Sequence, residues 1–241
     1  MINKKIKLLL IITLVFVFSC STNNVGADND FLAYYNTFYS AETSFDKAEE
    51  IIDNSPLDIE ISKSTIDLLD IAIENSNIIL DKYYNTQYID DAYYIIARSS
   101  IYKEQLTVAK YYFEKIVRDY PESDFFYESY IWLGFIELDF GNYENLDNIM
   151  LYLNNNLDKV EKISLYYLFL AKYYETFKYD KSAIQEQYLL AIDSENQSSK
   201  KRKIYLELIN IEDSNKNYYK VIEYIGYLNE LSDFDLDTDL L

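Results

Sequence analysis

The residue types that could carry chemistry are few in this chain of 241 residues, and most of them are carboxylates. The sequence holds 41 Asp and Glu, one cysteine and no histidine, so the commonest general base and metal ligand is missing. Acids stand side by side at Asp90-Asp91 and at Glu49-Glu50, where one could serve as an acid and the other as a base. Adjacent residues on a helix point apart, however, so an acidic, solvated helix surface explains these pairs better.

Other catalytic patterns are also missing from the sequence. It has no Gly-rich loop before Lys-Ser or Lys-Thr, and the alternating acids of DFDLDTDLL (233–241) lack the glycine turn and closing glutamate of an EF-hand. We therefore expect no enzyme, no metal site and no cofactor. The net charge of −19 also disfavours nucleic acid as a partner. The many acidic residues of the chain fit a solvated helix exterior. The alternative is that some of them form a patch that binds a cation or a partner.

The single cysteine, Cys20, lies two residues after the apolar run LLLIITLVFVF (8–18), which itself follows a lysine-rich start. The run is too short for a membrane span, which needs roughly 20 apolar residues, but it suits the centre of a secretory signal. The tetrapeptide VFSC (17–20) resembles a bacterial lipobox, with a departure at Phe18, where small residues are commoner. The resemblance implies cleavage before Cys20 and acyl chains such as palmitate on its sulfur and new amino terminus. An ordinary signal peptide or an uncleaved signal anchor is the alternative.

The lipobox also predicts where the protein resides. Two or three acyl chains anchor a protein stably, and Ser21 is not the aspartate that retains such proteins at the inner membrane. We expect an outer-membrane anchor with the domain facing the periplasm, and display on the cell surface is the alternative. The predicted divisions are a signal peptide at 1–19, a lipidated linker at 20–30, a helical repeat domain at 31–231 and an acidic tail at 232–241.

Helical composition and a fixed spacing predict the fold class. Four glycines and two prolines leave few turns and few helix breakers, so the chain is predicted to be all-α. Mostly small residues recur every 37 positions in two series, one on each of two helical patterns per unit. They are Ala97, Gly134 and Ala171 in the first series, and Ala72, Ala109, Leu146 and Ala183 in the second. Such a period predicts stacked helical hairpins that form an α-solenoid.

One unit, YYIIARSSIYKEQLTVAKYYFEKIVRDYPES (93–123), resembles a tetratricopeptide (TPR) repeat. Six of its residues stand at motif positions: Tyr93, Ile96, Ala97, Ala109, Phe113 and Pro121. Ser100 departs from the motif tyrosine. The units that begin near Tyr127 and Ser164 are more degenerate, with matches at Tyr130, Leu133, Gly134, Tyr167, Leu170, Ala171, Tyr174 and Ala183. A weaker fourth unit lies in 205–228, and an upstream hairpin precedes Ala72.

The TPR resemblance implies a concave groove lined by the first helix of each repeat. The residues implied to bind a partner there are Asp91, Tyr94, Arg98, Ile101, Glu128, Ile131, Phe135, Leu138, Leu165, Leu168, Lys172 and Glu175. Their mixture of aromatic, aliphatic and charged groups suits an extended peptide or a partner helix. Packing within the array is the alternative role for each aliphatic member. The basic run ENQSSKKRK (195–203) is predicted to be an exposed loop between repeats, with a docking patch for an acidic partner as the alternative.

Together, the lipobox and the repeats resemble the BamD family of lipoproteins, which serve the outer-membrane β-barrel assembly machinery. The resemblance implies a lipid-anchored scaffold that binds a protein partner in the cell envelope. A general envelope scaffold for secretion, gliding or cell-wall machinery is the alternative, because no BamD-specific contact residue can be carried over to this sequence.

Overall fold

The computed structural model describes residues 37–55 and 60–238. Within these ranges 82% of the residues are helical and none forms a strand, so the predicted all-α class is confirmed. The predicted signal peptide, Cys20 and the lipidated linker lie outside the described residues.

Ten α-helices follow one another along the described chain, each packed mostly on its neighbours in sequence. They are α3 (Tyr39–Asn54), α4 (Lys63–Lys82), α5 (Ile89–Tyr102), α6 (Leu106–Asp119), α7 (Phe126–Phe140), α8 (Tyr143–Asn155), α9 (Ile163–Thr176), α10 (Lys181–Ser194), α11 (Ser198–Ser214) and α12 (Tyr218–Thr238), with a short 3₁₀ turn at Leu157–Lys159 after α8. The helices α5, α7 and α9 begin 37 residues apart, so the period predicted from the sequence is the period of the hairpins.

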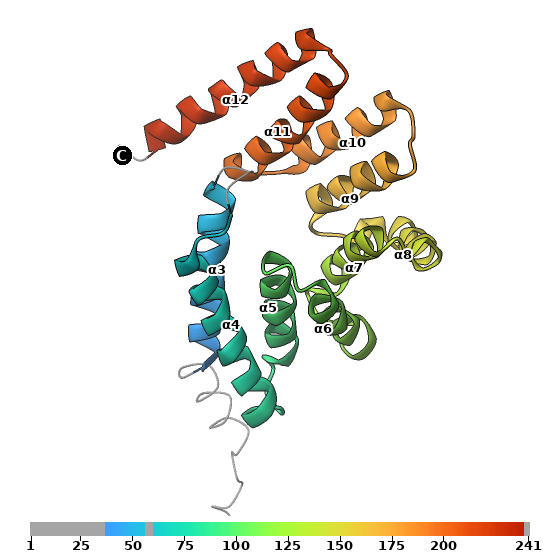
Figure 1. Ribbon diagram of the computed structural model, residues 1–241. Helices are drawn as coiled ribbons and strands as arrows, with labels where there is room; N and C mark the ends of the chain where they lie inside the picture. The colour runs from blue at the N-terminus through green and yellow to red at the C-terminus, as the bar shows by residue number, and fades with distance from the viewer. Residues whose placement is uncertain (1–36, 56–59, 239–241) are drawn as a thin grey trace, which may run out of the picture.

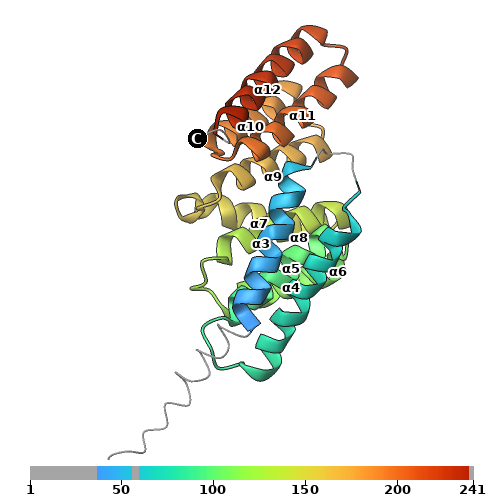
Figure 2. The same cartoon turned by 90° about the vertical axis from the view of Figure 1, so that its left-hand side faces the viewer.

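The hairpins stack into an array that curves back on itself (Figure 1). Helices α3 and α4 form one side of the curve, α5 to α10 continue it, and α11 and α12 return toward the upper end of α3. A second view shows the α11–α12 hairpin at one end of the array and α3 crossing in front of α5 and α7 (Figure 2). Because α11 contacts α3, the first and last hairpins close the concave side.

The hairpin turns share one backbone conformation at four places. Glu104, Gly141, Lys178 and Lys216 all have left-handed φ values, between 55° and 68°. At Gly141 the next amide, Asn142 N–H, donates to the carbonyl of Glu137 at 3.0 Å, which is the Schellman closure of a helix. Only one of the four positions is glycine, so the other three hold a conformation that side chains disfavour.

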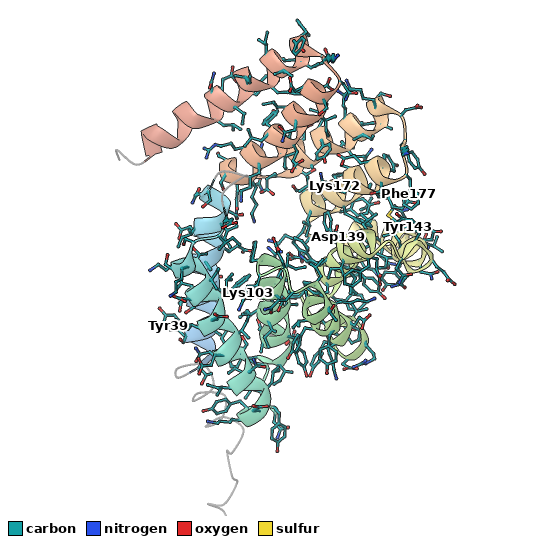
Figure 3. The ribbon with its side chains drawn as sticks, viewed as in Figure 1. Tyr39, Lys103, Asp139, Tyr143, Lys172 and Phe177 are labelled. Carbon is teal, nitrogen blue, oxygen red and sulfur yellow. The ribbon has the colours of Figure 1, made fainter. Side chains whose placement is uncertain are left out.

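Aromatic side chains connect neighbouring hairpins near these turns. The rings of Tyr143 at the start of α8 and Phe177 at the end of α9 lie 4.9 Å apart in an edge-to-face contact (Figure 3). Ion pairs also cross between hairpins, since Lys110 on α6 reaches Glu137 on α7 at 2.9 Å. The Lys181–Glu212 pair repeats this arrangement between α10 and α11 at 2.6 Å.

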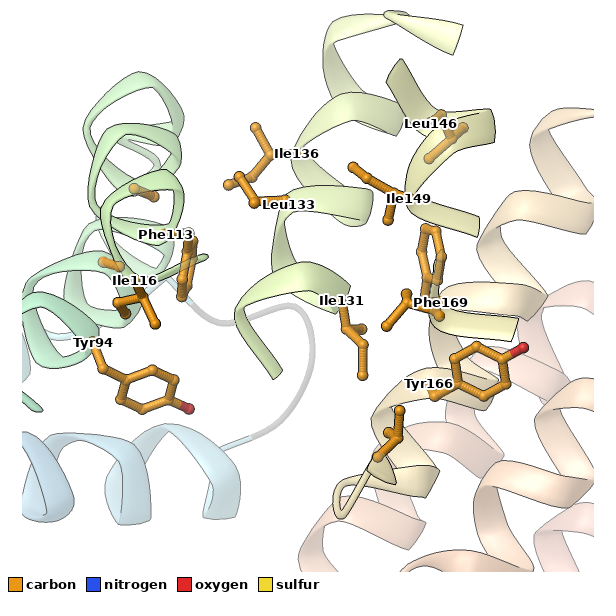
Figure 4. Packing of buried hydrophobic residues seen from close by; sticks show 14 of the residues in the cluster. Tyr94, Phe113, Ile116, Ile131, Leu133, Ile136, Leu146, Ile149, Tyr166 and Phe169 are labelled. Carbon is orange, nitrogen blue, oxygen red and sulfur yellow. The ribbon is translucent and has the colours of Figure 1, made fainter. Parts of the chain in front are cut away.

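Among the described residues the core is a succession of three apolar clusters, one centred on α3–α5, one on α5–α9 and one on α9–α12. In the central cluster Ile131, Ile149 and Phe169 converge from three helices (Figure 4). Gly134 lies against this cluster, and a β-carbon built there would stand 2.6 Å from the Phe169 ring. A small residue is therefore required at this position of the first series, because α7 and α9 approach closely.

The structure departs from the regular sequence pattern at Ala183 and corrects the loop prediction for the basic run. Ala183 is only partly buried, unlike the other members of its series, because α10 turns Tyr188, Ala191 and Ile192 inward instead. The basic run is not a loop throughout, since residues 198–203 form the first turns of α11. Lys200 and Lys203 of this run are held against α3, as described below.

Candidate functional site

A cavity of about 610 Å³ lies on the concave side of the array. Its lining comes from the first helices α3, α5, α7, α9 and α11, from the turns before α9 and α11, and from the last residue of α10. The partly buried Leu165 and Leu168 provide an apolar wall, and Trp132 and the almost fully buried Ile204 also line the cavity. Volumes of about 300–1,000 Å³ are usual for ligand sites, so the cavity is large enough to hold a small molecule or part of a chain.

Five of the twelve residues predicted for the groove line this cavity: Tyr94, Arg98, Glu128, Leu165 and Leu168. Four more line a separate hollow of about 240 Å³ between α7 and α9: Phe135, Leu138, Lys172 and Glu175. Asp91 lines a third hollow, of about 370 Å³, near the start of α5. Ile131 is fully buried in the core and Ile101 packs against it. The structure therefore divides the predicted groove into three hollows and two packing positions.

Arg98 is the central charged group of the cavity. Its Nη2 donates to Glu49 Oε1 at 2.5 Å and to the Tyr102 hydroxyl at 2.7 Å, and that hydroxyl also donates to Glu49. Its guanidinium carbon lies 4.0 Å from the centre of the Trp132 ring, a stacking geometry that stabilises a cation. The side chain is thus held between α3 and α7 and joins the two walls of the cavity.

The pKa of Glu49 reports this arrangement. Burial alone would raise it, but the charge of Arg98 and the hydrogen bonds from Tyr102 and Arg98 lower the pKa of the carboxyl below its usual value. The carboxylate is therefore ionised in the folded protein under neutral conditions. Breaking one partner of such a buried pair costs much more than an exposed ion pair contributes.

Tyr94 is engaged within the protein. Its hydroxyl donates to Glu128 Oε1 at 2.6 Å, and Trp132 Nε1 donates to the same oxygen at 3.3 Å. Its ring is stacked on Phe125 with centroids 4.1 Å apart, and only 9% of the residue is exposed. Tyr94 therefore supports the cavity wall and has little surface left for a partner.

Lysines of α11 close the mouth of the cavity against the end of α3. Lys203 Nζ donates to the carbonyl of Ile52 at 2.6 Å and lies 3.6 Å from Asp53 Oδ1. Lys200 Nζ lies 3.6 Å from the other carboxylate oxygen of Asp53. A helix carboxyl end attracts cations, and α3 ends at Asn54, so these contacts favour the closed array.

The sequence predicted some of the cavity residues and missed others. Repeat spacing located those on α5, α7 and α9, but Glu49, Asp53, Tyr102 and Trp132 were missed as cavity residues. The basic run was the available signal for Lys200 and Lys203, because it is a concentration of positive charge in an acidic chain.

Of the two adjacent acid pairs, Asp90-Asp91 contains a carboxyl group whose pKa is shifted by its surroundings. Burial raises the pKa of Asp91 to about 6, and the charges of Asp90, Glu42 and Asp124 add to the effect.

In the described part of the chain, no group of three or more His, Cys, Asp or Glu is arranged to hold a metal ion. None of the described helices has the length and apolar composition to cross a membrane.

The fold and the cavity define the class as an all-helical protein whose sequential helix pairs build a repeat-like array. No protein-family model matches the chain, and no curated protein matches it.

Proposed function

We propose that the protein is a lipid-anchored helical-repeat scaffold that binds an extended segment of a protein partner in the central cavity. The observation that carries the proposal is the composition of that cavity. An apolar wall of Leu165 and Leu168 lines the same cavity as the charged groups of Arg98, Glu49 and Glu128, which hydrogen bonds hold in fixed positions. Apolar anchors give a bound chain its affinity, and fixed charges give it direction.

An extended segment suits the cavity better than a helix. The cavity measures about 610 Å³, and the contact between α11 and α3 bounds it on one side. A helix with its side chains is about 10–12 Å across, whereas an extended chain is narrower and enters with less displacement of these helices.

The finer assignment rests on the sequence resemblance. The lipobox at Cys20 supports an acyl anchor, and the TPR-like unit at 93–123 supports a partner-binding repeat protein. We propose a BamD-like role in outer-membrane protein assembly, with the domain facing the periplasm and without catalysis. A general envelope scaffold for secretion, gliding or cell-wall machinery is the alternative that the experiment must separate.

Photo-cross-linking in intact cells tests the site. A photoreactive residue is placed at Leu168 in the cavity and, as the matched control, at Leu151, which is 63% exposed on α8. We expect a protein adduct at Leu168 and none at Leu151. An adduct with a β-barrel assembly protein supports the BamD-like role, and one with another envelope protein supports the general scaffold. An adduct at Leu151 alone contradicts binding in the cavity.

A second variant measures the contribution of the wall. Replacement of Leu165 and Leu168 with alanine together should weaken capture by about 2 kcal/mol, or about 30-fold, if both are anchors. Circular dichroism checks that the double variant is folded. Undiminished capture by the folded variant refutes the site, and turnover of a substrate by the isolated protein refutes the class.

A further inference from the structure

The contact between α11 and α3, which closes the array, differs from the contacts between successive hairpins (Figure 1). The three apolar clusters follow one another along the described chain, and partly buried rings join them: Tyr93 packs against the first and second clusters, and Tyr167 against the second and third. In the described residues, none of these clusters contains side chains from both α3 and α11. Apolar burial therefore holds successive hairpins together but not the two ends of the array.

Charged groups hold the two ends together instead. Lys200 and Lys203 of α11 both meet the carboxylate of Asp53 on α3, each with an Nζ–Oδ distance of 3.6 Å. Lys203 also donates to the carbonyl of Ile52 at 2.6 Å. Burial lowers the pKa of Lys203, Asp53 opposes this effect, and the positive charge of Lys200 adds to it. The two ammonium groups thus repel each other while they share one carboxylate, so the contact is easily broken.

Solvent-accessible space adjoins this contact in two places. One is the central cavity, and the other is a separate hollow of about 360 Å³ at the carboxyl end of α3. Asp53, Gln197 and Lys200 line both spaces. Ion pairs that solvent reaches are screened by salt, and each contributes little to stability. The ionic strength should therefore decide how firmly α11 is held to α3.

Separation of the two ends requires no unfolding. A stacked array bends by small rotations between successive hairpins, and these add up from one end to the other. The hairpins stay packed on their neighbours through the apolar clusters while α11 and α3 move apart. Lys200, Lys203 and Asp53 themselves line the cavity, so their separation removes part of its boundary.

We propose that the α3–α11 contact is a salt-sensitive gate, which opens to admit the partner segment to the central cavity. This regulation rests on the proposed function, because the gated cavity is the proposed binding site. A protein that binds its ligand only in the open form shows an affinity reduced by the fraction of molecules that are open. Weakening of the gate should therefore increase capture of the partner.

Carbodiimide coupling of the purified full chain measures the closed population. The reagent joins an amine and a carboxylate that touch, so it links Asp53 to Lys200 or Lys203 only in the closed array. Between about 0.1 and 1 M salt the screening length falls from about 10 Å to about 3 Å, and we expect the linked product to fall at least about threefold. Mass spectrometry of the digested chain measures the product.

The matched control is the ion pair between Lys103 on α5 and Asp70 on α4. These two helices share the first apolar cluster, so the amine and the carboxylate stay close when salt screens their attraction. We expect this product to change less than about twofold over the same range of salt. An unchanged product at Asp53, or an equal fall at Asp53 and Asp70, overturns the gate.

Asp53→Asn tests whether the gate controls entry to the cavity. It removes the carboxylate that holds both lysines, and Asp70→Asn makes the same change at the control pair. Both are made in the chain that carries the photoreactive residue at Leu168, and circular dichroism checks that they are folded. In intact cells we expect at least about threefold more adduct with Asp53→Asn and no change with Asp70→Asn.

The outcomes separate failure of the gate from failure of the proposed function. If the parent gives an adduct at Leu168 and Asp53→Asn gives an equal or smaller amount, the gate is refuted and binding in the cavity stands. An equal increase with Asp70→Asn also refutes the gate. If none of the three chains gives an adduct, the proposed function is refuted, and the coupling experiment alone decides whether the contact opens.

Discussion

Gly134 provides the sharpest test of the close packing between α7 and α9. Gly134→Ala adds one β-carbon, which would stand 2.6 Å from Cε2 and Cζ of Phe169. Phe169 is fully buried, so its ring cannot move out into solvent. Overpacking of this kind costs about 1–3 kcal/mol, and the better helix propensity of alanine returns about 1 kcal/mol. We expect a net loss of about 0–2 kcal/mol in the free energy of unfolding.

Gly226→Ala is the matched control for this substitution. The chemical change is the same and also lies inside a helix, but the added carbon meets nothing within 4 Å. We expect it to gain about 1 kcal/mol from helix propensity alone. In urea unfolding followed by circular dichroism, the free energies of unfolding of the two variants should therefore differ by about 1–3 kcal/mol. Gly226→Ala should be more stable than the parent, and Gly134→Ala should be equally stable or less stable.

A double variant tests whether the ring of Phe169 causes the loss of stability in Gly134→Ala. Phe169→Leu removes the ring atoms that the alanine would meet, so Gly134→Ala should cost less in that background than in the parent. The coupling between two contacting positions is expected at about 1–2 kcal/mol. If Gly134→Ala is as stabilising as Gly226→Ala, or if the two changes at 134 and 169 are additive, the close approach is refuted.

Three further substitutions test the turns and the charged groups. Lys178→Gly should stabilise the protein by about 1 kcal/mol in urea unfolding, because Lys178 has a left-handed φ of 55°; a loss of stability would contradict the strain. Glu49→Gln should destabilise it by about 2–4 kcal/mol at neutral pH, because Arg98 stays buried without its carboxylate. The pKa of Glu49 is lowered by folding, so this difference should shrink as the pH falls through that lowered value, and a pH-independent difference would refute the assignment. Asp91→Asn should stabilise the protein by about 1 kcal/mol above pH 6 after allowance for solvent screening, and the gain should vanish toward pH 4, because folding raises the pKa of Asp91 to about 6.

The sequence was sufficient for the features that depend on local rules. The all-helical class follows from the scarcity of helix breakers, and the hairpin period follows from Ala97, Gly134 and Ala171, which the structure buries on α5, α7 and α9. A helix exposes a regular side-chain pattern, so repeated packing leaves a repeated spacing in the sequence. Five of the predicted groove residues line one cavity for the same reason, because their spacing places them on first helices.

Other features have no local signature. The turns at Glu104, Lys178 and Lys216 carry no glycine, so their left-handed conformation is visible only in the backbone. Ala183 keeps the spacing of its series, but the residues that α10 buries are Tyr188, Ala191 and Ile192. Burial depends on the helix that lies opposite, which the sequence of one helix does not specify.

The closure of the array was decided by tertiary structure alone. Lys203 meets the carbonyl of Ile52 across 151 residues of chain, and the same region joins Lys200 to Asp53. The basic run in the sequence singled out these lysines, but it did not identify α3 as the helix that they contact. The two ends of the array meet only because a small rotation between successive hairpins accumulates over the whole array. Repeat spacing alone therefore predicts an open groove, and the curvature of the five hairpins in the described part of the chain makes it a cavity.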